Sequence, residues 1–371
     1  MKNYITPIAA GVLLATTSGV ANAKSTIGGV VFTNYYVQQL EDRGGVQGDD
    51  RTNSILDVAN NSRFRIRWDN EDSVSMYIEL ALRDDEKDNI RHAYGKWDIN
   101  ETHQLLVGQT STPFAPLNPN VAMVNNSGQG YGSVSPSRPS QIRYTYKFLN
   151  RQGALAIALV DPNGGFDPQK NSGSKSGGNS AGDRETRVPR MDIGLAYKTF
   201  NWQIFPSMFY HDQSYTEGDD LESYGYSLGA KTGAGAFTFA AEVGGGRNWG
   251  NTKMSMSGSD AGDNAGAVYD SVGRKLEDTD NTGYWVDLGW RFNNSTIKGS
   301  AHFVYGALSS DADGYFDYES NMVGVSVPID LPWIARGFRI RPEVFRFEDE
   351  NKLTGLDRSQ TIWGVQLQYT F

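Results

Sequence analysis

Alternation of polar and apolar residues is the feature that most constrains the fold of this chain. From Arg63 to Trp68, three arginines alternate with three large apolar residues, and Ser73 to Arg83 repeats the pattern. Because successive side chains of a strand point to opposite faces, each segment predicts a strand with one apolar and one polar face. The same alternation recurs at 141–148, 191–200, 224–231, 237–243, 284–292, 297–305 and 363–371. The chain is therefore predicted to be all-β.

Hydropathy narrows the class further. After residue 23 no apolar segment approaches the roughly 20 residues that a spanning helix needs, which excludes a helical membrane protein. A membrane barrel is compatible with the polar mean hydropathy of −0.50, because its strands present only alternate residues to lipid. Cysteine is absent, so a disulfide framework and a thiolate metal site are excluded.

The links between the predicted strands separate a soluble sandwich from a membrane barrel. Short links alternate with long polar ones along the whole chain, as expected of tight periplasmic turns and extended outer loops. The short links are 69–72, 100–102, 150–152, 201, 233–235, 293–294 and 330–336. The long links are 41–53, 84–91, 110–140, 161–189, 212–220, 244–281, 307–315 and 348–359. This reading predicts a transmembrane antiparallel β-barrel of about sixteen strands with both termini on the periplasmic side.

Aromatic residues lie next to the short links, where a membrane–water interface would favour them. The alternative is a soluble β protein with ordinary strand-end aromatics, which leaves the asymmetry of the links unexplained. The residues concerned are Trp68, Phe148, Trp202, Trp290, Phe292, Tyr369 and Phe371.

The first 23 residues have the features of a secretory signal peptide. Lys2 precedes an apolar stretch from Ile5 to Val20, and Ala21-Asn22-Ala23 follows it. Residues 1–23 are expected to be cleaved, which leaves 24–371 as one barrel domain in the bacterial outer membrane.

Several segments resemble the general bacterial porins, in the order expected of that family. They are Asn61 to Phe64, Trp68 to Asp72, Ala93 to Trp97, Val107 to Phe114 and the terminal Tyr369-Thr370-Phe371. The resemblance implies a sixteen-stranded homotrimer whose terminal Phe371 is recognised by the barrel-assembly machinery. It also implies outer-membrane lipids and lipopolysaccharide as surroundings, and passive diffusion of small hydrophilic solutes and ions.

In that family the third extracellular loop folds into the lumen and narrows it, so the resemblance assigns this role to Thr110 to Ser140. The residues expected at the constriction are Pro113, Phe114, Asn118, Asn120, Asn125, Tyr131 and Arg138. One departure is the absence of any Asp or Glu between Glu101 and Asp161. Family loops usually supply acidic residues opposite an arginine ladder, and this loop has none.

The polar strand faces are predicted to line a water-filled channel. The proposed pore-lining residues are Arg63, Arg65, Arg67, Tyr77, Glu79, Arg83, Arg143, Lys147, Arg291, Arg339 and Arg341. Further acidic residues expected on this face are Asp192, Glu242, Asp287 and Glu343. Since the net charge of the chain is −9, most acid must lie in the loops. A basic lumen concentrates anions, so weak to moderate anion preference is predicted.

Three other functions remain open. The first is a substrate-specific channel for phosphate, organic anions or sugars, although only Tyr77 and Trp285 offer inward rings. A barrel enzyme is the second; it would need one of the four histidines as a base, and no nucleophile motif surrounds a serine, so no catalytic residue is assigned. A structural protein or phage receptor is the third.

No cofactor, metal or nucleic-acid partner is indicated. Asp311-Ala312-Asp313-Gly314 begins like a calcium loop but lacks the distant bidentate glutamate. Nucleotide fingerprints, zinc spacings and basic nucleic-acid patches are also absent from the sequence.

Overall fold

The computed structural model describes residues 24–43, 50–59, 61–70, 73–82, 90–121, 132, 135–136, 138–161, 165–170, 172, 180–252, 254–255, 259–294 and 297–371. The signal peptide predicted at 1–23 lies outside this part of the chain. No helix among the described residues is long and apolar enough to cross a membrane.

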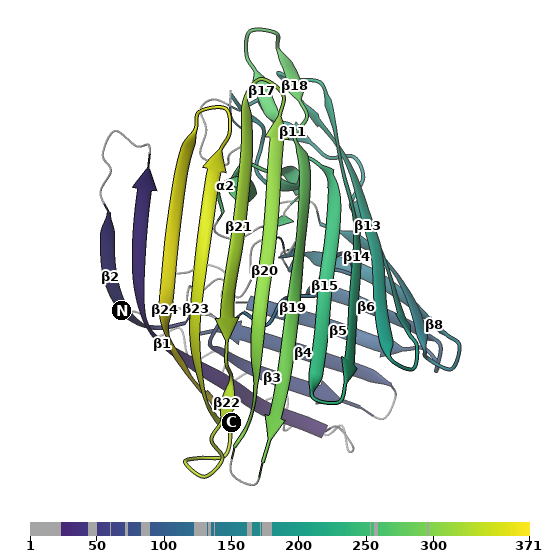
Figure 1. Cartoon of the computed structure of the whole chain (residues 1–371). Helices are drawn as coiled ribbons and strands as arrows, with labels where there is room; N and C mark the ends of the chain where they lie inside the picture. The colour runs from purple at the N-terminus through teal and green to yellow at the C-terminus, as the bar shows by residue number, and fades with distance from the viewer. Residues whose placement is uncertain are drawn as a thin grey trace, which may run out of the picture.

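A single antiparallel sheet closes on itself to form a barrel (Figure 1). Its strands are β1 (Lys24–Arg43), β2 (Arg51–Val58), β3 (Arg63–Asp69), β4 (Val74–Ala81), β5 (Ile90–Asp98), β6 (His103–Gln109), β8 (Ser140–Phe148), β9 (Gly153–Val160), β11 (Arg184–Glu185), β12 (Arg190–Lys198), β13 (Trp202–Tyr215), β14 (Asp220–Ala234), β15 (Phe237–Arg247), β19 (Asp280–Asn293), β20 (Lys298–Ala312), β21 (Phe316–Ser326), β22 (Ile329–Asp330), β23 (Phe338–Asn351) and β24 (Leu356–Thr370). Three pairs, namely β2 with β3, β11 with β12 and β21 with β22, are interrupted single strands, because each pair lines up on one neighbour. The described residues thus form the predicted sixteen-stranded barrel.

The two ends of the chain close the barrel. β1 pairs with β24 from Val30↔Thr370 to Arg43↔Asp357. Beyond the ladder, the Gly29 N–H donates to the Phe371 carbonyl at 3.0 Å, and the Phe371 N–H donates back at 3.2 Å. A Cβ atom at Gly29 would lie 2.6 Å from the Phe371 ring, so only glycine fits beneath this terminal aromatic residue.

The outer surface of the barrel is apolar, as the alternation predicts. Ile142, Tyr144 and Tyr146 on β8 are all more than 40% exposed, whereas their neighbour Arg143 points to the other face. Large apolar side chains left exposed over several neighbouring strands would be unstable in water, and they match a lipid-facing belt.

Short turns join the strands at the lower end of the barrel in Figure 1, and longer segments join them at the upper end. At three upper links the strands extend further than predicted. The ladders continue to Ser214↔Asp220, Ala312↔Phe316 and Asn351↔Leu356, so most of 212–220, 307–315 and 348–359 is paired strand. Above a lipid belt a strand needs no apolar face, so the alternation that marks the lower part is lost although the ladder goes on.

Two of the upper links, the fourth (161–189) and the sixth (244–281), carry short elements that lie over the barrel. These are β10 (Gln169–Lys170), η1 (Trp249–Thr252), β16 (Met254–Ser255), α2 (Asp260–Asp263), β17 (Val268–Asp270) and β18 (Lys275–Glu277). β10 pairs with β17, and β16 pairs with β7 (Ser135–Pro136) of the third link. The three long links therefore form one connected assembly.

Candidate pore and constriction

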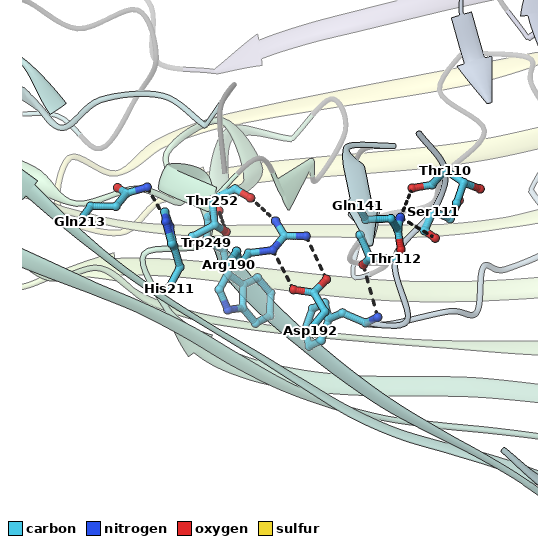
Figure 2. A network of polar contacts seen from close by, with 11 residues as sticks. Thr110, Ser111, Thr112, Gln141, Arg190, Asp192, His211, Gln213, Trp249 and Thr252 are labelled. Atoms are coloured by element: carbon cyan, nitrogen blue, oxygen red, sulfur yellow. Dashed lines mark hydrogen bonds and ion pairs between the residues drawn. The ribbon is translucent and has the colours of Figure 1, made fainter. Parts of the chain in front are cut away.

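The third loop lies between β6 and β8, and its described residues 110–121 fold into the barrel. Its first residues are tied to β8, because the Gln141 side chain donates to the Thr110 carbonyl at 2.7 Å (Figure 2). Arg143 also donates to the Ser111 carbonyl, at 3.2 Å. The loop then reaches β12, where a Cβ atom at Gly194 would lie 2.4 Å from the Pro113 carbonyl oxygen. The predicted inward course of this loop is confirmed.

Phe114 anchors the loop to the inner wall. Its ring is fully buried and packs edge-on against Phe209 of β13, with ring centroids 4.9 Å apart. Trp249 of η1, Ala261 of α2 and Leu308 of β20 complete the same apolar cluster. One aromatic residue of the third loop therefore joins the wall to the sixth link.

Backbone N–H groups of the third loop donate to side chains on successive strands of the inner wall. The Ala115 N–H bonds Ser207 Oγ at 3.0 Å, and the Leu117 N–H lies 3.4 Å from Glu242 Oε2. The Asn120 N–H bonds Asp287 Oδ2 at 2.7 Å. The wall thus supplies the acceptors that the loop backbone needs inside the barrel.

The acidic residues predicted on the channel face are covered. Asp192, Glu242, Asp287 and Glu343 are each 6% exposed or less. Glu242 and Asp287 lie beneath the third loop, and Asp192 is paired with Arg190. Trp285, expected to face the channel, is fully buried as well. These side chains lie on the inner face of their strands, as predicted, but they are not open to the lumen, and the third loop covers Glu242 and Asp287.

Arg190 and Asp192 form a buried ion pair that holds the sixth link. Arg190 Nε and Nη2 donate to the two carboxylate oxygens of Asp192 at 2.8 and 2.9 Å, and both side chains are 0% exposed (Figure 2). The remaining guanidinium nitrogen donates to the Thr252 carbonyl at the end of η1. A bidentate pair of this kind fixes geometry as well as charge.

The opposite wall carries the predicted arginines. On β3, Arg63, Arg65 and Arg67 stand across from Ala81, Glu79 and Tyr77 of β4. The Arg67 side chain is 59% exposed and that of Arg63 27%. We call Arg63, Arg65, Arg67, Arg91 and Arg143 the basic wall.

Glu79 is the buried centre of the basic wall. Arg91 Nε donates to it at 2.8 Å, the Tyr77 hydroxyl donates at 2.7 Å, and Arg63 Nε lies 3.7 Å away. No hydrogen bond or ion pair to the Arg65 guanidinium is found in the described part of the chain. One carboxylate therefore serves several guanidinium groups, and the wall keeps an excess of positive charge.

Arg91 and Tyr94 are inner-face residues that the sequence reading missed. The β4–β5 register shifts between Glu79 and Leu80, which is a β-bulge. This irregularity brings both Arg91 and His92 close to Glu79, at 2.8 and 3.9 Å. Strict alternation assigns only one of two consecutive residues to a face, so it could not find both.

Arg138 lies where the third loop returns to the wall. Its Nε donates to His92 Nε2 at 3.2 Å, and His92 Nδ1 lies 2.8 Å from Thr110 Oγ1. Burial, and after it the nearby positive charge of Arg91, lower the pKa of Arg138 to about 10. Arg138 therefore stays charged at neutral pH and adds to the basic wall.

The other predicted lining residues are spread toward the short-turn end. Lys147 pairs with Asp98 at 3.4 Å and Arg339 pairs with Asp330 at 2.7 Å. Arg341 and Arg291 lie on the inner faces of β23 and β19. Arg83, Asn125 and Tyr131 lie outside the described residues. That these side chains line a water-filled channel stays a prediction.

Asp287, His302 and Ser300 line up like a catalytic triad. His302 Nδ1 lies 2.8 Å from Asp287 Oδ1, and its Nε2 lies 2.9 Å from Ser300 Oγ. The Asn120 amide nitrogen is 3.3 Å from the same Nε2. A third-loop amide thus contacts the atom that a general base would use, and Asp287 and His302 already hold that loop. Among the described residues no group of His, Cys, Asp and Glu could hold a metal ion.

Comparison with known proteins bears on the fold alone. No protein-family model and no curated protein matches the sequence. The outer membrane channel DcaP of Acinetobacter baumannii superposes with a TM-score of 0.71 and 16% identity, over 95% of this chain and 99% of that one. The anion-selective porin of Comamonas acidovorans gives a TM-score of 0.60 and 10% identity, over 94% and 100%.

The fold is that of the outer-membrane porins. A third structure, outer-membrane expressed OmpT of Vibrio cholerae, has the same fold, with a TM-score of 0.55 and 11% identity over 94% of this chain and 98% of that chain. The identities are too low to transfer any activity. The function of this chain therefore has to be inferred from the residues of its own inner wall.

Proposed function

We propose that this protein is an outer-membrane diffusion channel for small hydrophilic solutes and ions, with a preference for anions. One observation carries the proposal: described residues of the third loop cover acidic groups on one wall, whereas on the other wall the Arg67 side chain is 59% exposed and that of Arg63 27%. The loop itself contributes no carboxylate between Glu101 and Asp161. The charge that faces the remaining lumen is therefore mainly positive.

A positive wall beside water in a low-dielectric barrel concentrates anions and repels cations. Rings of arginine and lysine select anions in other pores by the same physics. Because Glu79 neutralises part of the basic wall, the preference should be moderate. The acidic outer links, with Asp311, Asp313 and Asp317, then lie at the mouth and not at the constriction.

The proposal includes the surroundings of the channel. The apolar outer face would lie in the lipid of a bacterial outer membrane, with the long links outside near lipopolysaccharide and the short turns in the periplasm. Export by the predicted signal peptide, assembly through Phe371 and a homotrimeric state belong to the same proposal. The trimer form named for OmpT of Vibrio cholerae is compatible with it.

The test is the reversal potential of the purified protein in a planar bilayer under a potassium chloride gradient. We expect large ohmic steps whose reversal potential shifts toward the chloride equilibrium value. A shift toward the potassium value would reject the anion preference. Absence of any conductance would reject the channel itself.

A substrate-specific channel is the alternative, and one arrangement favours it. Tyr77 and Tyr94 are neighbours on the inner wall, with ring centroids 5.6 Å apart and ring planes tilted by 39°, in one cross-strand row with Arg67. Aromatic rings beside guanidinium groups suit an organic anion. Micromolar block of chloride current by aromatic carboxylates, but not by acetate, would support this alternative.

A further inference from the structure

A second concave site lies on the wall opposite the basic wall, on the short-turn side of the third loop. It is a cavity of about 510 Å³ between the inner faces of β12 to β20 and the third-loop residues Asn118 and Asn120. The short turn at residues 199–201 borders it below. We call it the vestibule pocket; it shares no residue with the basic wall.

The sequence explains why a hollow forms there. Lys198, Gln203, Lys231, Ala240 and Asp287 form one row across five neighbouring strands. Ala240 separates the long side chain of Lys231 from Asp287, and small residues at 233 and 238 follow in the next row. The side chains of the wall are therefore short between Lys231 and Asp287, and this leaves the hollow.

The third loop borders this hollow on its upper side and does not fill it. The Asn120 N–H is held by Asp287 at 2.7 Å, and the Asn120 side chain lies 3.3 Å from His302 Nε2. These contacts fix the loop at the far edge of the pocket. The amide groups of Asn118 and Asn120 are thereby placed along its upper border.

Three cations face the pocket, and none of them has a carboxylate partner in the described part of the chain. Lys198, Lys231 and Arg291 are all exposed to the cavity. Lys231 Nζ lies 5.3 Å from the centroid of the Phe205 ring, and Arg291 donates to the Gly235 carbonyl at 3.0 Å. The one acid that borders the pocket, Asp287, already accepts hydrogen bonds from the loop and faces His302.

The spacing of the cations indicates how many anionic groups a ligand needs in order to contact more than one of them. Lys198 and Lys231 flank Gln203 in one row, so their Cα atoms are two strand spacings apart, about 10 Å. A monovalent anion can neutralise only one of them. An anion with two or more carboxylate or phosphate groups can reach both, and Arg291 adds a third contact with planar donors.

We propose that the vestibule pocket is a binding site for small polyvalent oxyanions, separate from the basic wall. The inference deepens the proposed anion preference. It depends on the proposed function in one respect only, namely that water fills the lumen. A solute would pass two cationic sites on opposite walls, the basic wall at the constriction and the vestibule pocket beyond it. Binding in the vestibule pocket would slow polyvalent anions relative to chloride.

The test is isothermal titration calorimetry of the purified full-length protein in detergent, with citrate and tripolyphosphate as polyvalent probes and acetate as the monovalent one. We expect saturable binding of a polyvalent probe and none of acetate. In the K198Q/K231Q/R291Q variant the affinity should fall at least tenfold. The matched control is R247Q/K275Q/K352Q, which removes three cationic side chains at the long-link end and should bind like the parent.

Two results would overturn the proposal. Unchanged affinity in the pocket variant is one. The other is loss of binding only in R63A/R65A/R67A, which would place the anion on the basic wall. Because calorimetry needs no current, a protein that binds citrate but does not conduct would reject the proposed channel and keep the pocket.

Discussion

The carboxylate of Asp287 accepts a hydrogen bond from the backbone N–H of Asn120, 167 positions away in sequence, at 2.7 Å. This contact joins the middle of the third loop to the wall of the barrel. Ser207 and Glu242 hold the preceding residues of the loop in the same way. In this chain the acidic groups of the wall hold the loop, and the loop hides them from the lumen.

Replacement of Asp287 by alanine should loosen the third loop. The variant loses a charged acceptor of the Asn120 N–H and the partner of His302, and a hydrogen bond to a charged group contributes about 1.5–3 kcal/mol. We expect a lower thermal midpoint and larger open-channel current noise in single-channel recordings. D311A, which removes an exposed aspartate at the long-link end, is the control. Quiet channels with a parental midpoint in D287A would show that this contact does not hold the loop.

The R63A/R65A/R67A variant should lose anion preference and still fold. These side chains lie on the inner face of β3, where Arg67 is 59% exposed, and the apolar face of that strand is untouched. Charged walls raise local counter-ion concentration about tenfold or more. We therefore expect the chloride-to-potassium permeability ratio to fall at least threefold toward one, measured from reversal potentials. An unchanged ratio in a correctly folded variant would show that these arginines do not determine the ion selectivity.

Glu79→Gln should act in the opposite direction on selectivity. The substitution removes the carboxylate that Arg63 and Arg91 share and leaves an amide oxygen for the Tyr77 hydroxyl. The wall gains one net positive charge, so the chloride-to-potassium permeability ratio should rise. Stability should fall by about 1–3 kcal/mol, because the buried arginines lose their counter-charge. A ratio that falls in E79Q would mean that Glu79 organises the wall more than it neutralises it.

The alternation of residues such as Arg63 to Trp68 was sufficient to predict the strands and the barrel, because a lipid-facing strand must be apolar on alternate positions. The third-loop residues Pro113, Phe114, Asn118 and Asn120 lie in the loop that enters the lumen, as the family resemblance implied. Arg138 lies at the end of that loop, beside His92.

The parts that could not be predicted depend on contacts between distant segments. Burial of Glu242 and Asp287 follows from the path of the third loop, which no local pattern records. Arg91 reaches Glu79 through a bulge, which breaks the period of two. The role of Arg190 requires the sixth link to fold back over the barrel, and that link is a Gly-, Ser- and Asn-rich stretch in the sequence.

Ser300 should not react as a catalytic nucleophile. Although His302 and Asp287 stand in line with it, the Asn120 amide lies 3.3 Å from His302 Nε2, the atom that would accept the serine proton. We expect a serine-directed fluorophosphonate to leave the intact mass of the folded protein unchanged, with a known serine hydrolase labelled in parallel. Stoichiometric labelling that S300A abolishes would assign an enzymatic function to this site.

The Arg190–Asp192 pair provides the sharpest test of how the sixth link is held. Removal of one partner leaves an uncompensated charge at a position with 0% exposure, which costs about 3–5 kcal/mol. R190L should therefore lower the unfolding temperature strongly, as measured by heat modifiability on a gel. R190L/D192L should be less damaging, because no buried charge is left unpaired, although the Thr252 carbonyl still loses its donor. If the double variant is no more stable than R190L, then the bond to the sixth link, and not the ion pair, is what stabilises this region.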